Sequence, residues 1–288
     1  MVSKRATMYK IKWVAHYLEL MRFHKPVGIF LLLWPTLWAL WIASGGFPST
    51  KNLFIFIGGV VLMRAAGCVI NDIADRKLDL QVKRTQTRLI TSGKISVHNA
   101  LLLFFALCLM AFLLVLMTNP LTILLSFFAL CVATFYPFAK RYTHFPQVIL
   151  GIAFSFAIPM AFSAVHNHIP AIAWLIMIIN MLWTVMYDTL YAMVDRDDDL
   201  KIGIKSTAIL FGKCDKLMIG LLQLTVITLL CLLGFLLNFL LIYFVAVFIA
   251  LLLFIYQQKL ISDRIPDKCF QAFLNNQWVG LIVFIGIL

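Results

Sequence analysis

Long runs of apolar residues, separated by short polar stretches, recur along the whole chain. A helix needs about 20 predominantly apolar residues to cross the roughly 30 Å hydrocarbon core of a membrane. Because lipid cannot satisfy backbone hydrogen bonds, each crossing segment must form a helix. We therefore expect nine membrane-spanning helices, at residues 27–44, 52–71, 99–117, 120–138, 147–165, 170–192, 217–236, 238–256 and 270–288.

The expected fold class is an all-α integral membrane protein, in which a single bundle of nine transmembrane helices forms one domain over residues 1–288. Composition agrees, because 63% of the residues are hydrophobic and only 12% are charged. Soluble domains usually carry about a quarter of charged residues. Asn275, Asn276 and Gln277 interrupt the last apolar run, so we expect either a short ninth helix or a terminus clipped relative to its relatives.

The net charge of +12 is distributed unevenly among the loops. Of the 24 Lys and Arg residues, 22 fall before the first span or in every second loop, and only Lys51 and Arg64 fall elsewhere. Lys and Arg are enriched on the cytoplasmic side of membrane proteins. The pattern therefore predicts a cytoplasmic amino terminus and an outside carboxyl terminus. Membrane topology explains the positive charge, so we expect no nucleic acid as a partner.

Eight of the twelve acidic residues lie in two short clusters, each at the predicted cytoplasmic end of an apolar run. The first cluster extends from Asn71 to Asp79, and the second from Asp188 to Asp199. Ionisable residues at membrane depth are costly and usually functional. Because two matched clusters occur in a chain otherwise almost free of acid, we expect a site for a divalent metal and an anionic ligand.

Helical periodicity selects some members of the first cluster. At about 100° per residue, Asn71, Asp75 and Asp79 share one helix face if the helix continues through the cluster. Arg64, seven residues before Asn71, falls on the same face, whereas Asp72 points elsewhere. The spacing therefore predicts three oxygen donors and one cation on a common face.

The second cluster repeats this arrangement. Asp188, Asp195 and Asp199 lie within about 40° of one another on a helix. Tyr191 flanks them, and Asp197 points to the opposite side. Carboxylate and amide oxygens suit Mg²⁺, which typically uses one or two carboxylates, waters and substrate phosphates. Two such sets that face each other can hold metal ions bridging a diphosphate.

Basic residues near the clusters fit an anionic ligand. Arg84 and Arg88 are spaced i, i+4. Lys140 and Arg141 follow Tyr136. Such cations stabilise negative charge that develops on a leaving group. The alternative, solvated helix caps that pair with neighbouring Lys and Arg, stays open for either cluster alone, but two clusters with matching periodicity favour the ligand site.

The clusters read Asn71-Asp72-x-x-Asp75-x-x-x-Asp79 and Asp188-x-x-Tyr191-Ala-x-x-Asp195-x-x-x-Asp199. This pair resembles the signatures of the intramembrane aromatic prenyltransferase superfamily. The resemblance includes segments 32–40, 63–68, 136–142 and 201–207, and it covers most of the chain. The run from Tyr191 to Asp199 and the Lys-Ile-Gly-Ile-Lys-Ser-Thr segment at 201–207 are similar to the hydroxybenzoate branch.

The resemblance implies transfer of a polyprenyl group from polyprenyl diphosphate to the ring carbon ortho to the hydroxyl of 4-hydroxybenzoate. It also implies a Mg²⁺ cofactor and a place in ubiquinone biosynthesis at a bacterial inner membrane. The implied metal ligands are Asn71, Asp75, Asp79, Asp188, Asp195 and Asp199. The implied substrate-binding residues are Arg64, Arg84, Arg88, Lys140, Arg141 and Tyr191, and the implied catalytic residues are Asp75, Asp195 and Tyr136.

Two other functions stay open on the sequence. A sister enzyme would prenylate another acceptor, such as a naphthoate, haem or homogentisate, although Arg64 and the hydroxybenzoate-like segment favour a small benzoate. An ion-coupled transporter would place its acids near the bilayer midplane, often on broken helices. Membrane lipid is a further expected partner, because the apolar bundle offers the prenyl tail a lipid-facing place and keeps water from the reacting centre.

Overall fold

The computed structural model describes residues 14–82 and 85–288, which form helices and connecting turns without any strand. The expected fold class is confirmed, because nine segments within these ranges are long and apolar enough to cross a membrane. The helices that form them begin and end within four residues of the predicted spans, except that the seventh segment already begins at Thr207 rather than at residue 217. They are α2 (Val27–Ser44), α3 (Thr50–Asp75), α4 (Val97–Val115), α5 (Pro120–Ala139), α6 (Pro146–Ser155) followed by α7 (Ala157–His166), α8 (Ala171–Ala192), α10 (Thr207–Phe211) leading into α11 (Asp215–Leu236), α12 (Leu241–Leu260) and α13 (Pro266–Ile287).

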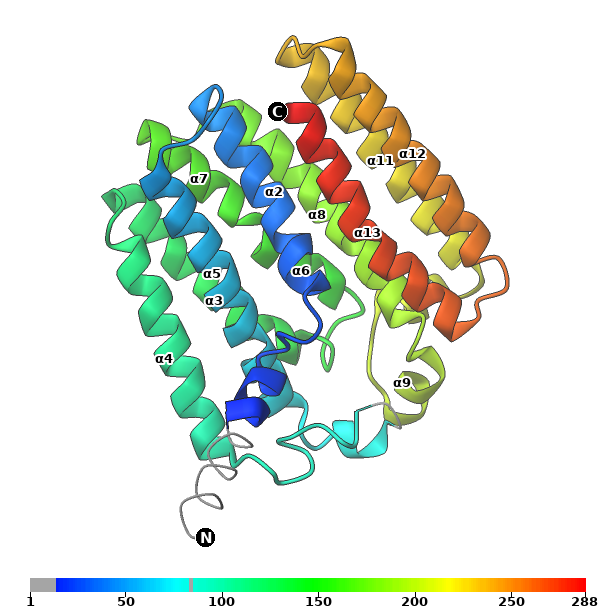
Figure 1. Ribbon diagram of the computed structural model, residues 1–288. Helices are drawn as coiled ribbons and strands as arrows, with labels where there is room; N and C mark the ends of the chain where they lie inside the picture. The colour runs from blue at the N-terminus through cyan, green and yellow to red at the C-terminus, as the bar shows by residue number, and fades with distance from the viewer. Residues whose placement is uncertain (1–13, 83–84) are drawn as a thin grey trace, which may run out of the picture.

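The helices pack side by side as one bundle (Figure 1). The closest partners are α3 with α4, α6 with α8, and α12 with α13, while α2 packs against both α7 and α13. In Figure 1, α4 lies at one edge of the bundle and the α11–α12 pair at the other. The carboxyl terminus lies at one end, and the loop after α3 and the short helix α9 (Arg196–Ile202) lie at the opposite end.

Two polar residues of the last span, the buried Asn276 and the half-buried Asn275, are paired with neighbouring helices. Trp183 Nε1 on α8 donates a hydrogen bond to Asn276 Oδ1 over 2.9 Å. Gln257 Nε2 on α12 donates to Asn275 Oδ1, also over 2.9 Å. Such bonds between membrane helices stabilise the bundle by about 0.6 kcal/mol on average. Because the amides have these partners, α13 is continuous over 22 residues, and the expectation of a short ninth helix is wrong.

The two long loops at the site end contain short helices. The 3-10 helix η1 (Asp79–Gln81) lies after α3, and α9 lies after α8. Since α3 ends at Asp75 and α8 at Ala192, neither membrane helix continues through its acidic cluster. The shared helix face was predicted for a helix that continues through the cluster. Since neither helix does so, turns position the later acids of each cluster.

Candidate active site

A cavity of about 1000 Å³ lies between the helices and extends from the acidic end toward the opposite end of the bundle. Its polar end contains the acidic clusters, and its apolar part includes Leu31, Phe112 and Phe127. Ligand pockets are usually about 300–1,000 Å³. The volume therefore lies at the upper end of that range and suits a ligand with a polar head and a long apolar body.

The first acidic cluster is divided between the cavity and the surrounding protein. Asn71, Asp75 and Asp79 line the cavity, whereas Asp72 does not. Asp72 is instead almost fully buried beside Arg22, whose Nη2 donates to Asp72 Oδ1 over 2.7 Å. The three residues that share a predicted helix face are thus the three that reach the cavity, even though the helix ends at Asp75.

The second acidic cluster is divided in the same way. Asp188, Tyr191, Asp195 and Asp199 line the cavity, and Asp197 does not. Asp188 belongs to α8, Asp195 is the residue before α9, and Asp199 lies within α9. Both clusters therefore contribute oxygen atoms to one cavity from different helices.

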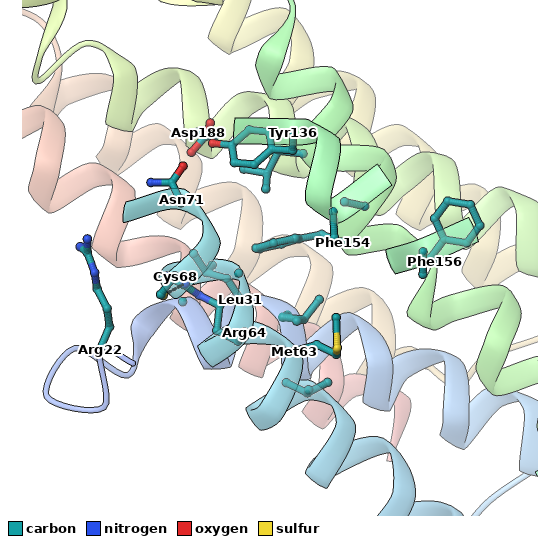
Figure 2. Close-up of a pocket in the computed structure, with 18 of the residues that line it drawn as sticks. Arg22, Leu31, Met63, Arg64, Cys68, Asn71, Tyr136, Phe154, Phe156 and Asp188 are labelled. Carbon is teal, nitrogen blue, oxygen red and sulfur yellow. Dashed lines mark hydrogen bonds between the residues drawn. The ribbon is translucent and has the colours of Figure 1, made fainter. Parts of the chain in front are cut away.

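Three polar residues converge at the acidic end of the cavity. Asn71 of α3, Tyr136 of α5 and Asp188 of α8 point toward one another (Figure 2). Gln147 of α6 also lines the cavity, and its Oε1 accepts from the backbone N–H of Thr207 over 3.0 Å. Gln147 thus ties α6 to the start of α10. The sequence does not single out Gln147, because one glutamine within an apolar run gives no spacing signal.

Two of the predicted cations lie at the acidic end. Lys140 and Arg88 both line the cavity. Lys140 Nζ forms an ion pair with Asp75, and Arg88 Nη1 bonds to Asp79 Oδ2 over 2.9 Å. Burial raises the pKa of Asp79, and the positive charge of Arg88 opposes that shift. Arg84, the other predicted member of this basic pair, lies outside the described residues.

Arg141 and Arg22 differ in whether they line the cavity. Arg141 does not line the cavity; its Nη2 donates to the carbonyl oxygen of Ala74 over 2.5 Å, and its Cζ lies 5.5 Å from the centre of the Phe138 ring. These contacts fasten the end of α5 to the end of α3, so the structure does not bring Arg141 together with the other predicted substrate-binding residues. Arg22 does line the cavity, and the sequence showed it only as a topological charge.

Arg64 lies deeper in the cavity, on α3 below Asn71 and near Leu31 (Figure 2). Its Nη1 contacts Cys68 Sγ. Its Nε is buried and has no hydrogen-bond partner among the described residues. A buried donor without a partner is energetically costly. The guanidinium is therefore suited to bind an anionic group of a ligand.

The oxygen donors fit a magnesium ion that a substrate helps to hold. Within residues 14–82 and 85–288, no three His, Cys, Asp or Glu side chains form a ready metal site. Asp75 Oδ1 is nevertheless buried without a hydrogen-bond partner in this part of the chain. Mg²⁺ is commonly bound through one or two carboxylates together with waters and substrate phosphates. The dispersed set of carboxylates and an amide matches that mode of binding.

Residues 32–284 match the sequence model of the UbiA prenyltransferase family. The chain belongs to the UbiA prenyltransferase family. A 4-hydroxybenzoate octaprenyltransferase of Coxiella burnetii (strain CbuK_Q154) is 58% identical over 275 residues, and the match covers 96% of each chain. A 4-hydroxybenzoate octaprenyltransferase of Yersinia enterocolitica is 54% identical over 283 residues, covering 98% of each chain.

Solved structures agree with the family and the fold of this membrane prenyltransferase. A UbiA homologue from Aeropyrum pernix K1 superposes with a TM-score of 0.79 at 26% identity and covers 90% of this chain and 96% of its own. A UbiA homologue from Archaeoglobus fulgidus, solved with GPP and Mg²⁺, has a TM-score of 0.69 at 17% identity, which shows the fold alone. Since both acidic clusters also line one cavity at one end of the bundle, the transporter interpretation loses its basis.

Proposed function

We propose that this prenyltransferase moves a polyprenyl group from polyprenyl diphosphate to the ring carbon ortho to the hydroxyl of 4-hydroxybenzoate. The observation that carries the proposal is one cavity that joins two sets of oxygen ligands, Arg64 and a long apolar volume. The choice of acceptor is supported by the names of two relatives that are more than half identical over nearly the whole chain. The charge asymmetry of the loops supports a reaction at the cytoplasmic face of a bacterial inner membrane.

The acidic end of the cavity would hold the diphosphate. Arg88 and Lys140 place positive charge there, which stabilises the diphosphate as its bond to the prenyl group breaks. When bound, Mg²⁺ neutralises negative charge on the diphosphate and so improves it as a leaving group. The residues that would hold the metal are Asn71, Asp75, Asp79, Asp188, Asp195 and Asp199.

Cleavage of the allylic C–O bond leaves positive charge on the prenyl carbon, and the apolar walls exclude the water that would otherwise react with it. Tyr136 lines the cavity beside Asp188, where an aromatic ring can stabilise a cation through its face. The aromatic carbon then forms the new C–C bond, and loss of its proton restores aromaticity. The polyprenyl tail would occupy the apolar part of the cavity and the adjoining lipid.

Arg64 would orient the acceptor. Its unpaired Nε offers a hydrogen bond to the benzoate carboxylate, and charged hydrogen bonds of this kind are stronger than neutral ones. Arg64 lies below the acidic end, so it would hold the carboxylate away from the diphosphate. The phenol ring would then face the allylic carbon. Tyr191 also lines this cavity, and the centre of its ring lies 4.9 Å from the centre of the Phe273 ring. The two rings would provide an aromatic wall.

The proposal is tested by incubating the purified protein in lipid with radiolabelled 4-hydroxybenzoate, octaprenyl diphosphate and Mg²⁺, with and without chelator. We expect a labelled product that partitions into hexane only when Mg²⁺ is present. Diphosphate release with a naphthoate, haem or homogentisate, but no product with 4-hydroxybenzoate, would keep the family chemistry and contradict the acceptor. Folded protein that is inactive with every acceptor would contradict the proposal as a whole.

Gly28→Ala is expected to raise the KM for 4-hydroxybenzoate about three- to tenfold and to leave the KM for the donor unchanged. A Cβ atom at Gly28 would collide with Nε and Nη2 of Arg64, so the guanidinium must move. A loss of about 1 kcal/mol in binding corresponds to roughly a fivefold weaker affinity. Steady-state kinetics in each substrate measure the effect. Gly59→Ala is the matched control, because Gly59 also lies on a cavity-lining helix but has open space around its Cβ position; equal KM values in the two variants would contradict the explanation.

A further inference from the structure

An ion-pair cluster around one buried carboxylate lies beside the second acidic cluster but does not line the cavity. At its centre is Asp215, the first residue of α11, which is fully buried. Arg196 Nη2 donates to Asp215 Oδ2 over 2.5 Å. Arg264 donates from Nε to both carboxylate oxygens over 3.0 Å and from Nη2 to Oδ1 over 2.8 Å. The backbone N–H of Lys216 adds a bond to Oδ1 over 2.6 Å, so both oxygens of Asp215 accept several hydrogen bonds.

The cluster connects three segments that are far apart in the sequence: α9, the start of α11, and the turn between α12 and α13. Arg264 Nη2 also donates to the carbonyl oxygen of Lys213 over 2.8 Å. Lys216 Nζ donates to the carbonyl oxygen of Ser262 over 2.9 Å. Arg264 has a φ of +55°, which is unfavourable for a residue with a side chain. These bonds therefore hold the turn against an unfavourable backbone conformation and fix it to α11.

Arg196 links this cluster to the acids of the cavity. It directly follows Asp195 and is the first residue of α9, the helix that also carries Asp199. None of the seven residues of α9 is buried, so apolar packing contributes little to the position of this helix. The bond between Arg196 and Asp215 is therefore a principal attachment of α9 to the bundle.

We infer that Asp215 is a positioning residue: through Arg196 it holds α9 so that Asp195 and Asp199 face the cavity. The inference rests on the proposed function, in which these two carboxylates hold the metal and diphosphate. Asp215 itself touches neither substrate, because it lies outside the cavity. Its carboxylate acts only through the guanidinium that it orients.

Arg196→Met in the full chain, reconstituted in lipid, tests the inference without leaving Asp215 unpaired, because Arg264 still bonds to it. We expect the Mg²⁺ concentration for half-maximal rate and the KM for octaprenyl diphosphate each to rise about tenfold, the effect of losing one charge-assisted hydrogen bond. The KM for 4-hydroxybenzoate, measured at saturating donor and Mg²⁺, should stay unchanged. Without substrates, amide hydrogen exchange at residues 195–202 should become faster.

Lys201→Met is the matched control. It removes the same charge from the same helix, but Lys201 is 71% exposed and forms only a surface ion pair with Asp198, so neither kinetics nor exchange should change. Arg196→Lys should restore part of the Mg²⁺ affinity. The double variant Arg196→Met/Asp215→Asn should need little more Mg²⁺ than Arg196→Met alone. The effects of two substitutions do not add when both residues act through the same contact.

Unchanged Mg²⁺ dependence together with unchanged exchange in Arg196→Met would overturn the inference. An equal rise in Lys201→Met would also overturn it, because loss of positive charge alone would then explain the effect. If the wild-type protein forms no product, the proposed function fails. Amide hydrogen exchange at residues 195–202 then still tests whether Arg196 attaches α9 to the bundle. Failure of the proposed function is thus distinguishable from failure of the inference.

Discussion

Asp75→Ala is expected to reduce magnesium-dependent prenyl transfer below detection, and Asp195→Ala to do the same. The two carboxylates line the same cavity from opposite clusters, and each would hold metal against the diphosphate. Loss of one electrostatic stabiliser typically lowers kcat about 10²–10³-fold. The measurement is the initial rate with saturating 4-hydroxybenzoate and octaprenyl diphosphate across a Mg²⁺ titration. Gel filtration of each variant would separate lost chemistry from lost folding.

Asp197→Ala is the control for this pair. Asp197 is an exposed residue of α9 that does not line the cavity, so its loss should change the rate only slightly. Asp75→Asn should behave like Asp75→Ala in Mg²⁺ dependence while keeping a polar neighbour for Lys140. If Asp197→Ala is as inactive as the other two alanine variants, the division of the cluster into cavity-lining and outward acids is wrong.

Arg64→Ala is expected to raise the KM for 4-hydroxybenzoate about 10–100-fold while the KM for the donor stays nearly constant. A hydrogen bond to a charged group contributes about 1.5–3 kcal/mol, and each 1.4 kcal/mol corresponds to roughly a tenfold change in affinity. Nε of Arg64 has no partner among the described residues, and the side chain's removal also takes away the contact of Nη1 with Cys68 Sγ. Steady-state kinetics with each substrate varied in turn provide the measurement.

A phenol without the carboxylate is the decisive control for this prediction. The wild-type protein and Arg64→Ala should use such an acceptor equally well, because the guanidinium then has no anion to bind. Arg64→Lys should recover only part of the affinity, since an ammonium is a point charge without the planar fork of a guanidinium. An unchanged KM for 4-hydroxybenzoate in Arg64→Ala would remove this residue from its proposed role.

The sequence by itself determined the nine spans and the members of each acidic cluster that reach the cavity. Span length is a local property, because the hydrocarbon thickness sets how many apolar residues a helix needs. Periodicity is also local, so it separated Asp75 from Asp72 and Asp195 from Asp197. The separation holds although α3 and α8 end within their clusters, since the turns that follow bring Asp79 and Asp199 back to the cavity.

Only the tertiary structure decided which residues meet across the chain. Arg22 pairs with Asp72 at a separation of 50 residues, Gln147 bonds to Thr207 at 60, and Arg141 reaches Ala74 instead of the cavity. Asn276 likewise stabilises the last helix through Trp183 on another span. No local pattern encodes such contacts, because a side chain's partner depends on how the helices pack. The same packing buries Asp215 and attaches α9 to the bundle.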